Sequence, residues 1–166
     1  MLYLIFVADS KASTMKSLHF ILLCLACVLC LTGYSQDDAG AVKGMIDSKR
    51  FVFEAQSMTP SRGGLRTLTP GYILVVSPDT VACDLPYMGR AYQAPMGSSD
   101  GGMTFHGSKF DYTVKEKKKG WTVNINMKEV SGNPRLILTV FDNASARLTI
   151  SSSSKESISY SGYIRR

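Results

Sequence analysis

Cysteine and histidine are scarce in this chain, and their scarcity excludes several classes of site. Three of the four cysteines lie in one N-terminal apolar segment, so a chain that loses this segment keeps only Cys83. A single thiol excludes an intramolecular disulfide. Of the two histidines, His19 lies in the same segment and only His106 lies beyond it. Because no recognisable ligand spacing is present, we predict no metal site and no cofactor.

A long apolar run is also missing. The longest one, Leu18 to Leu31, is shorter than the roughly 20 residues that a membrane-spanning helix needs. It follows a basic residue, Lys16, and ends in small and then polar residues, which is the three-part layout of a secretory signal peptide. We predict that translation begins at Met15 and that residues 1–35 are an upstream extension and a signal peptide. Cleavage after Ser35 then releases a single domain, residues 36–166, as a soluble protein of the periplasm or cell surface.

Lipid attachment through Cys27 is the competing prediction. Leu25 and Ala26 precede this cysteine as in a lipoprotein signal, but Cys24 stands where a large aliphatic residue is usual. The apolar run also continues after Cys27, where a lipoprotein turns polar. Cleavage after Ser35 is therefore favoured, and neither route leaves a transmembrane anchor.

The charge of the chain is modest. The formal net charge is +6, and the excess is scattered apart from Lys115 and the run 117–119. This distribution does not indicate a nucleic-acid partner. The lysine cluster has two interpretations, a contact with anionic lipid or polysaccharide and a solvated turn that protects a strand edge. The second is favoured from the sequence alone.

The pattern of apolar residues predicts an all-β domain with one short N-terminal helix. Residues 38–49 carry Val42, Met45 and Ile46 at helical spacing. From Phe51 onward, apolar residues alternate with polar ones or form short β-branched runs, which is typical of strands. Eight strands are predicted, within residues 51–56, 72–77, 80–85, 110–115, 121–128, 136–141, 146–150 and 158–163.

The connections indicate how these strands pair. From Phe110 onward each connection is short and rich in turn-forming residues, which predicts an antiparallel meander of five strands. About eight antiparallel strands in all fit either a small barrel or a sandwich. Residues 57–71 are predicted to be a turn-rich connection, and residues 84–109 a long loop. A loop of that length in a small domain is usually functional or mobile.

Four stretches resemble an uncharacterised domain family of exported proteins of the Bacteroidetes. They are S-K-R-F-V-F-E-A from Ser48, L-P-Y-M-G-R-A-Y from Leu85, D-G-G-M-T-F from Asp100 and Y-S-G-Y-I from Tyr160. Met88 stands where the family often has an aromatic residue. The resemblance covers nearly all of the predicted domain and implies export, by a signal peptide or a lipid anchor, and a mostly β fold. It implies no activity, because the family has no assigned function.

The loop after Leu85 holds the best candidate ligand-binding residues. Tyr87 and Tyr92 offer amphipathic rings, Arg90 a planar cation and Met88 a deformable apolar contact. His106 follows nearby in the sequence and completes the predicted set. The structural alternative is an irregular strand pair whose tyrosines cap the core, and it is the favoured interpretation.

No catalytic residues are predicted. Cys83 and His106 are the one nucleophile and base pair worth considering, but the alternation around Cys83 predicts a buried thiol. We therefore expect a non-catalytic binding module that contacts an unknown small ligand or an envelope protein. Its ligand would meet the loop or the interior of a barrel. The alternatives are a structural or interaction protein of the cell envelope and, ranked last, an unrecognised hydrolase.

Overall fold

The structure is a computed structural model that describes residues 38–90, 92 and 102–166. The predictions about Met15, Ser35 and Cys27 concern residues outside this part, and they stay predictions. Residues from Asp38 to Arg166 form one unit. Within the described residues, no helix combines the length and the apolar character that crossing a membrane requires.

Helix α2 (Asp38–Asp47) opens the domain where the apolar spacing predicts a helix. Val42 and Ile46 are almost completely buried, whereas Gly44 is exposed on the other side. A helix of this length is marginal in isolation, so burial of its apolar face stabilises it. The Tyr112 hydroxyl donates to the backbone carbonyl of Ile46 over 2.8 Å. The same carbonyl accepts a hydrogen bond from the amide of Lys49 over 3.2 Å, so the Tyr112 bond adds a second donor at the helix end and ties α2 to the strand that holds Tyr112.

Ten strands follow the helix in the described part of the chain, all in one antiparallel sheet. They are β1 (Phe51–Pro60), β2 (Arg66–Thr67), β3 (Ile73–Val76), β4 (Val81–Leu85), β5 (Met103–Gly107), β6 (Phe110–Lys117), β7 (Gly120–Met127), β8 (Arg135–Val140), β9 (Ser145–Ser151) and β10 (Ile158–Arg165).

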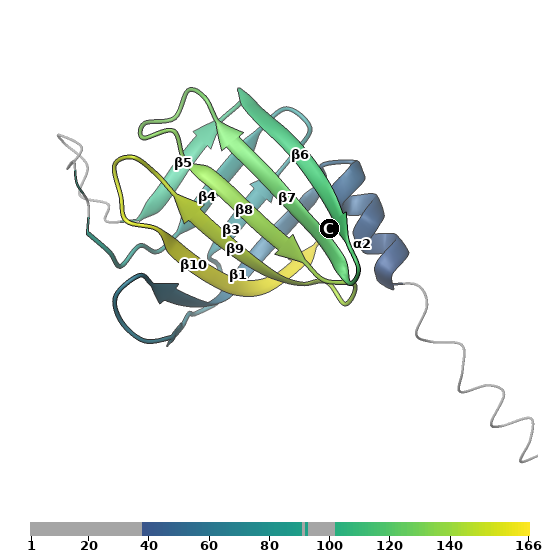
Figure 1. Ribbon diagram of the computed structural model, residues 1–166, viewed down its shortest axis with the longest axis horizontal. Coiled ribbons are helices and arrows are strands. Elements are labelled where there is room, and N and C mark those ends of the chain that lie inside the picture. The colour runs from purple at the N-terminus through teal and green to yellow at the C-terminus, as the bar shows by residue number, and fades with distance from the viewer. Residues whose placement is uncertain (1–37, 91, 93–101) are drawn as a thin grey trace, which may run out of the picture. The chain divides into compact units, whose positions relative to one another are not determined.

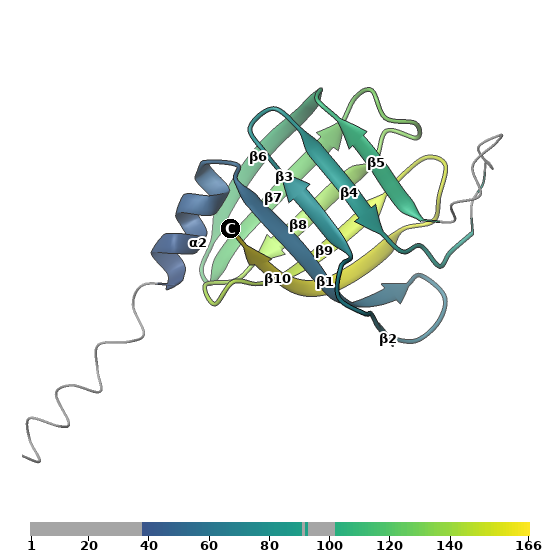
Figure 2. The same cartoon turned by 180° about the vertical axis from the view of Figure 1, so that it is seen from behind.

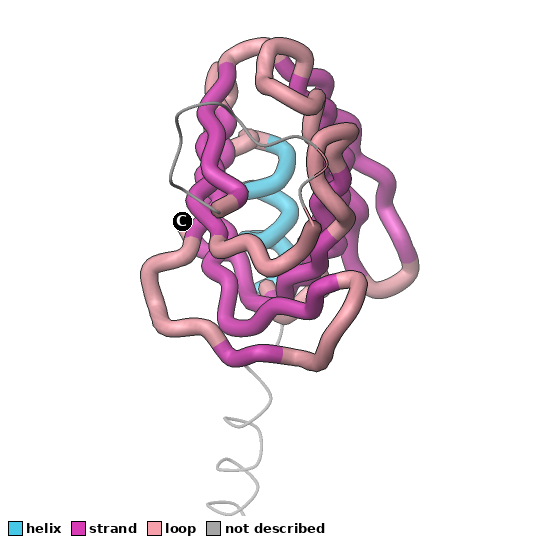
Figure 3. The backbone as a smooth tube through the Cα atoms, turned by 90° about the vertical axis from the view of Figure 1, so that its left-hand side faces the viewer, coloured by secondary structure: helices cyan, strands magenta, loops and turns pink. Residues whose placement is uncertain are grey.

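The sheet curls into a nearly closed barrel, which settles the choice between barrel and sandwich (Figures 1 and 2). The strand order is β5-β4-β3-β1-β10-β9-β8-β7-β6, with β2 paired to β1 beside this path. Strands β5 and β6 follow each other in the sequence but lie at the two ends of this order. Figure 3 shows α2 between the two walls of strands, and its buried side chains belong to the same hydrophobic core as theirs.

The predicted five-stranded meander is confirmed. Strands β6 to β10 pair with their neighbours in sequence order, each through a short connection. Strand β10 then pairs with β1 over nearly the whole length of both strands. This last pairing joins the meander to the N-terminal strands, so the β1–β10 ladder holds the two halves of the barrel together.

Side chains fill the interior of the barrel. The largest completely buried ones include Tyr160, Phe53, Leu74, Leu138 and Leu148, which come from strands all around the sheet. Small barrels have an interior just wide enough for such side chains. The predicted option of a ligand inside the barrel therefore has little support, which leaves the outer surface as the place for a ligand to bind.

Two segments that the sequence predicts as connections contain strands. Strand β1 continues to Pro60 because a bulge between Ala55 and Ser57 shifts the alternation by one residue. Its buried residues change from Phe53 and Ala55 to Met58 and Pro60, which hides the strand signal. Strand β5 lies inside the predicted long loop. Only its first residue, Met103, is fully buried, so its apolar pattern is weak.

Candidate functional site

The candidate loop begins where β4 ends at Leu85 and lies against the connection between β9 and β10. Residues 86–90 leave the sheet without regular structure, and residues 152–157 form the facing connection. We call the surface formed by residues 86–90, 92 and 152–156 the Tyr87 surface. Residues 91 and 93–101 lie outside the described part of the chain.

Backbone hydrogen bonds fix the two segments to each other. The amide of Glu156 donates to the carbonyl of Arg90 over 3.0 Å, and the amide of Tyr92 donates to the carbonyl of Ser154 over 2.8 Å. The amide of Arg90 also donates to Glu156 Oε2 over 3.4 Å. The Tyr160 hydroxyl reaches out from the barrel interior and donates to the carbonyl of Pro86 over 2.8 Å. The described part of the loop is therefore anchored at Pro86, Arg90 and Tyr92.

Tyr87 holds this loop together from within. Its hydroxyl lies 2.8 Å from the carbonyl of Arg90 and 3.1 Å from that of Glu156, so one O–H is shared between two acceptors. Burial raises the pKa of Tyr87, and the backbone hydrogen bond to Glu156 partly offsets this rise. Gly89 lets the chain turn over the ring, since a Cβ there would lie 2.5 Å from the Tyr87 hydroxyl oxygen. The side chain thus has a structural role.

The other residues of the loop face outwards. Met88 is 45% exposed and Tyr92 is 65% exposed, and Arg90 is exposed as well. Apolar and aromatic side chains on a fixed backbone are the usual ingredients of a recognition surface, because little conformational freedom remains to be lost on binding. The structure therefore brings four of the five predicted residues into one loop, with three of them accessible.

Sequence patterns do not identify two residues of the Tyr87 surface, Lys155 and Glu156. Lys155 Nζ lies 5.1 Å from the centre of the Tyr87 ring and donates to the carbonyl of Gly102 over 2.5 Å. The Glu156 carboxylate lies 3.7 Å from Arg62 Nε. No local pattern marks these residues, because they meet Tyr87 only through folding.

A small cavity adjoins this surface. It measures about 120 Å³ and is lined by Phe105, Val130, Pro134 and Lys155, among others. Sites for small molecules usually measure roughly 300–1,000 Å³. The cavity is therefore too small for a ligand of ordinary size, although Lys155 links it to Tyr87.

His106 lies away from the Tyr87 surface. It is exposed on β5 opposite Ala82, whereas the loop leaves the sheet after Leu85, which pairs with Met103 at the other end of the same ladder. The structure does not bring His106 together with the four loop residues, and its role in binding stays a prediction.

Cys83 is buried, as the sequence predicts. It pairs with Phe105, whereas His106 pairs with Ala82. Because successive residues of a strand point to opposite faces, Cys83 points into the barrel and His106 points away from it. Burial raises the pKa of the Cys83 thiol, and the neighbouring Asp84 raises it further. A buried thiol without an imidazole partner has the opposite of the environment that activates a nucleophile.

Acidic and metal-binding side chains do not gather in the described part of the chain. No three His, Cys, Asp or Glu side chains in residues 38–90, 92 and 102–166 are placed to hold a metal ion. Several carboxylates are paired with surface cations instead, as Asp111 is with Lys128 and Glu54 with Arg165.

Comparisons with known proteins agree with the fold. A family profile described as Domain of unknown function (DUF4251) matches residues 34–164. A crystal structure of a DUF4251 family protein from Bacteroides eggerthii DSM 20697 superposes with a TM-score of 0.59 at 20% sequence identity. The match covers 77% of this chain and 85% of that one. The comparison with curated proteins found no match.

Proposed function

The chain belongs to the DUF4251 family, whose description assigns no activity, and we propose that this member is an exported, non-catalytic binding module of the periplasm or cell surface. Membership confirms the resemblance drawn from the sequence. The signal-peptide layout before residue 36 supports export.

One observation carries the binding proposal. Met88 and Tyr92 are exposed on a loop whose backbone is tied to the β9–β10 connection by several hydrogen bonds. A large aromatic ring that is exposed on a fixed loop loses little entropy when a partner covers it. Arg90 on the same loop adds a planar cation that suits carboxylate or aromatic partners. In this proposal Tyr87 is a positioning residue, and Met88, Arg90 and Tyr92 make the contacts.

The kind of partner follows from the shape of this end of the barrel. Side chains fill the barrel interior, and the cavity beside Lys155 measures only about 120 Å³. Both features favour a partner that contacts the outer surface, such as an envelope protein or polymer, over a small molecule that is enclosed. An interaction protein of the cell envelope is thus the form of binding module that the geometry supports best.

Retention on isolated cell envelopes of a Bacteroides host tests this proposal. The double variant Met88→Ala, Tyr92→Ala should be retained at least about tenfold less than the natural chain, because side chains at the centre of an interface often contribute about 2 kcal/mol or more. Both side chains are largely exposed, so the variant should unfold at an unchanged temperature.

Val114→Ala is the matched control, because Val114 is also an exposed apolar side chain but lies on β6. Equal retention of the double variant and the natural chain would contradict the assignment of the Tyr87 surface. Export is tested separately by the mass of the mature protein, which should begin at Gln36. A protein that keeps its apolar segment in the cytoplasm would contradict that half of the proposal.

A further inference from the structure

The opposite end of the barrel carries a cavity of its own. Strand β9 begins at Ser145 and ends at Ser151, next to the Tyr87 surface, so the β6–β7 and β8–β9 turns lie at the far end. A cavity of about 540 Å³ lies there, lined by Lys117, Lys118, Lys119, Gly120, Trp121, Thr139, Val140 and Phe141. We call it the tip cavity. Its volume falls within the usual range for small-molecule sites.

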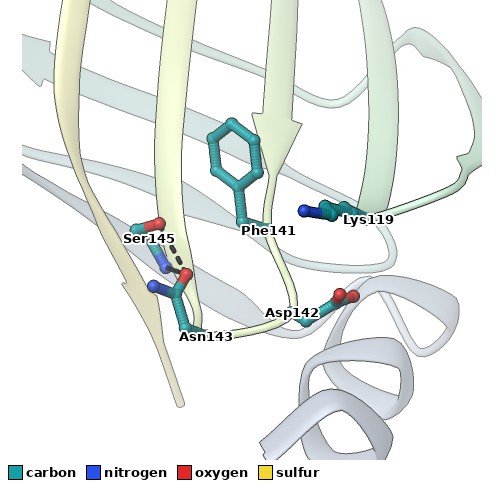
Figure 4. Close-up of a pocket in the computed structure, with 5 residues that line it drawn as sticks. All are labelled: Lys119, Phe141, Asp142, Asn143 and Ser145. Atoms are coloured by element: carbon teal, nitrogen blue, oxygen red, sulfur yellow. Dashed lines mark hydrogen bonds between the residues drawn. The ribbon is translucent and has the colours of Figure 1, made fainter.

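A second hollow of about 370 Å³ adjoins the tip cavity and shares two of its residues, Lys119 and Phe141. Figure 4 shows the Phe141 ring between Lys119 and the pair formed by Asn143 and Ser145. The Ser145 hydroxyl donates to Asn143 Oδ1 over 2.6 Å, so this polar wall is satisfied internally. Asp142 is the carboxylate that lines this second hollow.

The walls of the tip cavity are apolar. Phe141 is 44% exposed, whereas Val140 and Trp121, which also line the cavity, belong to the buried core. The Trp121 indole N–H is buried and has no hydrogen-bond partner in the described part of the chain. Buried polar groups are nearly always paired, so this N–H is an exception, but it is not accessible from the cavity and plays no part in binding there.

The rim of the tip cavity is cationic. Lys117, Lys118 and Lys119 are all exposed, and none lies in an ion pair with a carboxylate of the described residues. Glu116 is the nearest acidic residue along β6, and Asp142 lies across the turn. The sequence alone favours a solvated turn here, because it does not reveal that an apolar cavity lies beside the lysines.

We propose that the tip cavity binds a linear alkyl carboxylate. The carboxylate lies at Lys117–Lys119 and the alkyl chain lies against Phe141 and Trp121. The apolar walls and the cationic rim match the two halves of such a molecule. A hollow favours a single amphipathic anion over a flat membrane surface, because a membrane would contact Phe141 and the lysines without filling the space behind them. This site is separate from the Tyr87 surface and does not depend on the function proposed for it.

The chain provides its own probe for this site. Trp121 is the only tryptophan in the sequence, so intrinsic fluorescence reports on the tip cavity alone. Titration of the purified chain with decanoate, below its micelle concentration, should change this fluorescence to saturation. Octanoate should bind about 15-fold more weakly than decanoate, because each buried methylene contributes roughly a fourfold factor. Decanol, which has the chain without the charge, should bind at least about tenfold more weakly than decanoate.

Lysine variants locate the charged half of the ligand. Lys119→Gln should weaken decanoate binding about fivefold to tenfold and leave decanol binding unchanged. Lys115→Gln is the matched control, because Lys115 is an exposed lysine of β6, close to the same turn, that does not line the tip cavity. Phe141→Ala should reduce the difference between octanoate and decanoate, since the ring forms part of the apolar wall. Circular dichroism checks that each variant is folded.

Three results would overturn the proposal. Equal binding of decanol and decanoate would remove the role of the lysines, and affinity independent of chain length would remove the role of the apolar walls. The third is a fluorescence change with phosphatidylglycerol vesicles but none with decanoate. That result would assign the lysines and Phe141 to contact with an anionic membrane surface instead.

Discussion

Replacing Tyr160 by Phe removes one hydroxyl from the barrel interior and should destabilise the domain measurably. Tyr160 is completely buried, and its hydroxyl donates to the carbonyl of Pro86, at the start of the candidate loop. Loss of this bond leaves the carbonyl without its partner, which costs about 1–2 kcal/mol. For a domain of this size, the unfolding temperature should fall by about 4–7 °C.

Urea unfolding at pH 7 measures the effect. The midpoint should fall while the slope with urea concentration stays constant, because the surface exposed on unfolding does not change. Tyr72→Phe is the matched control. Tyr72 is half-buried and its hydroxyl bonds to no group in the described part of the chain, so its loss should change the free energy of unfolding by less than about 0.5 kcal/mol.

The same variant makes a sharper prediction at alkaline pH. Burial raises the pKa of Tyr160 above its ordinary value of 10.0, and the nearby Cys83 and Tyr87 raise it further. Above pH 10 the unfolded chain therefore releases this proton and the folded chain keeps it. The free energy of unfolding then falls by about 1.4 kcal/mol per pH unit until the folded pKa is reached. The Tyr160→Phe variant has no hydroxyl to ionise at this position, so its free energy of unfolding does not fall for this reason.

The stability curves of the two proteins should therefore cross. The natural chain is more stable by about 1–2 kcal/mol at pH 7, and it loses this advantage about one pH unit above 10, near pH 11. Tyr112 and Cys83 also have raised pKa values, but they are present in both proteins and cancel in the comparison. Curves that stay parallel from pH 9.5 to pH 11.5 would refute the reasoning, as would equal stability at pH 7.

Two further predictions concern packing. Gly162→Ala should destabilise the domain by about 3 kcal/mol or more, because a Cβ there would lie 1.9 Å from the carbonyl oxygen of Glu54 and force β1 and β10 apart. Gly44 lies on the exposed face of α2, where an added Cβ would have no atom within 4 Å, so Gly44→Ala should stabilise the domain by about 0.5–1 kcal/mol. If thermal unfolding gave the Gly162→Ala variant a higher unfolding temperature than the Gly44→Ala variant, both assignments would be contradicted. In a chain without the N-terminal apolar segment, Cys83 should react with a thiol reagent roughly 100-fold more slowly than free cysteine until urea unfolds the domain. Rapid labelling of the folded protein would show that the thiol is accessible.

The sequence predicts the meander well because its strands are amphipathic. Trp121, Val123 and Ile125 alternate with polar residues along β7, and all three are buried. Alternation of this kind fixes which face of a strand turns inwards, since a slip of one residue would expose every apolar side chain. Short turns between such strands leave antiparallel neighbours as the simplest pairing.

Where the apolar alternation is weak or shifted, the sequence pattern does not predict the strand. The bulge between Ala55 and Ser57 reverses the alternation within β1, so the strand seems to stop. Strand β5 buries only Met103 fully, and its place at the edge of the sheet leaves little apolar signal. Both strands are held by backbone hydrogen bonds to distant segments, which leave no trace in local composition.

By itself, therefore, the sequence determined the class of the domain, its helix, its meander and the burial of Cys83, because these follow from periodicity along the chain. Tertiary structure alone decided that the sheet curls into a nearly closed barrel, which residues face the candidate loop, and that a cavity lies beside the lysine turn. Tyr87 meets Glu156 across 69 positions of sequence, and the lysines of one turn meet Phe141 of another. Such contacts depend on which strand ends the barrel brings together, and no local pattern encodes that arrangement.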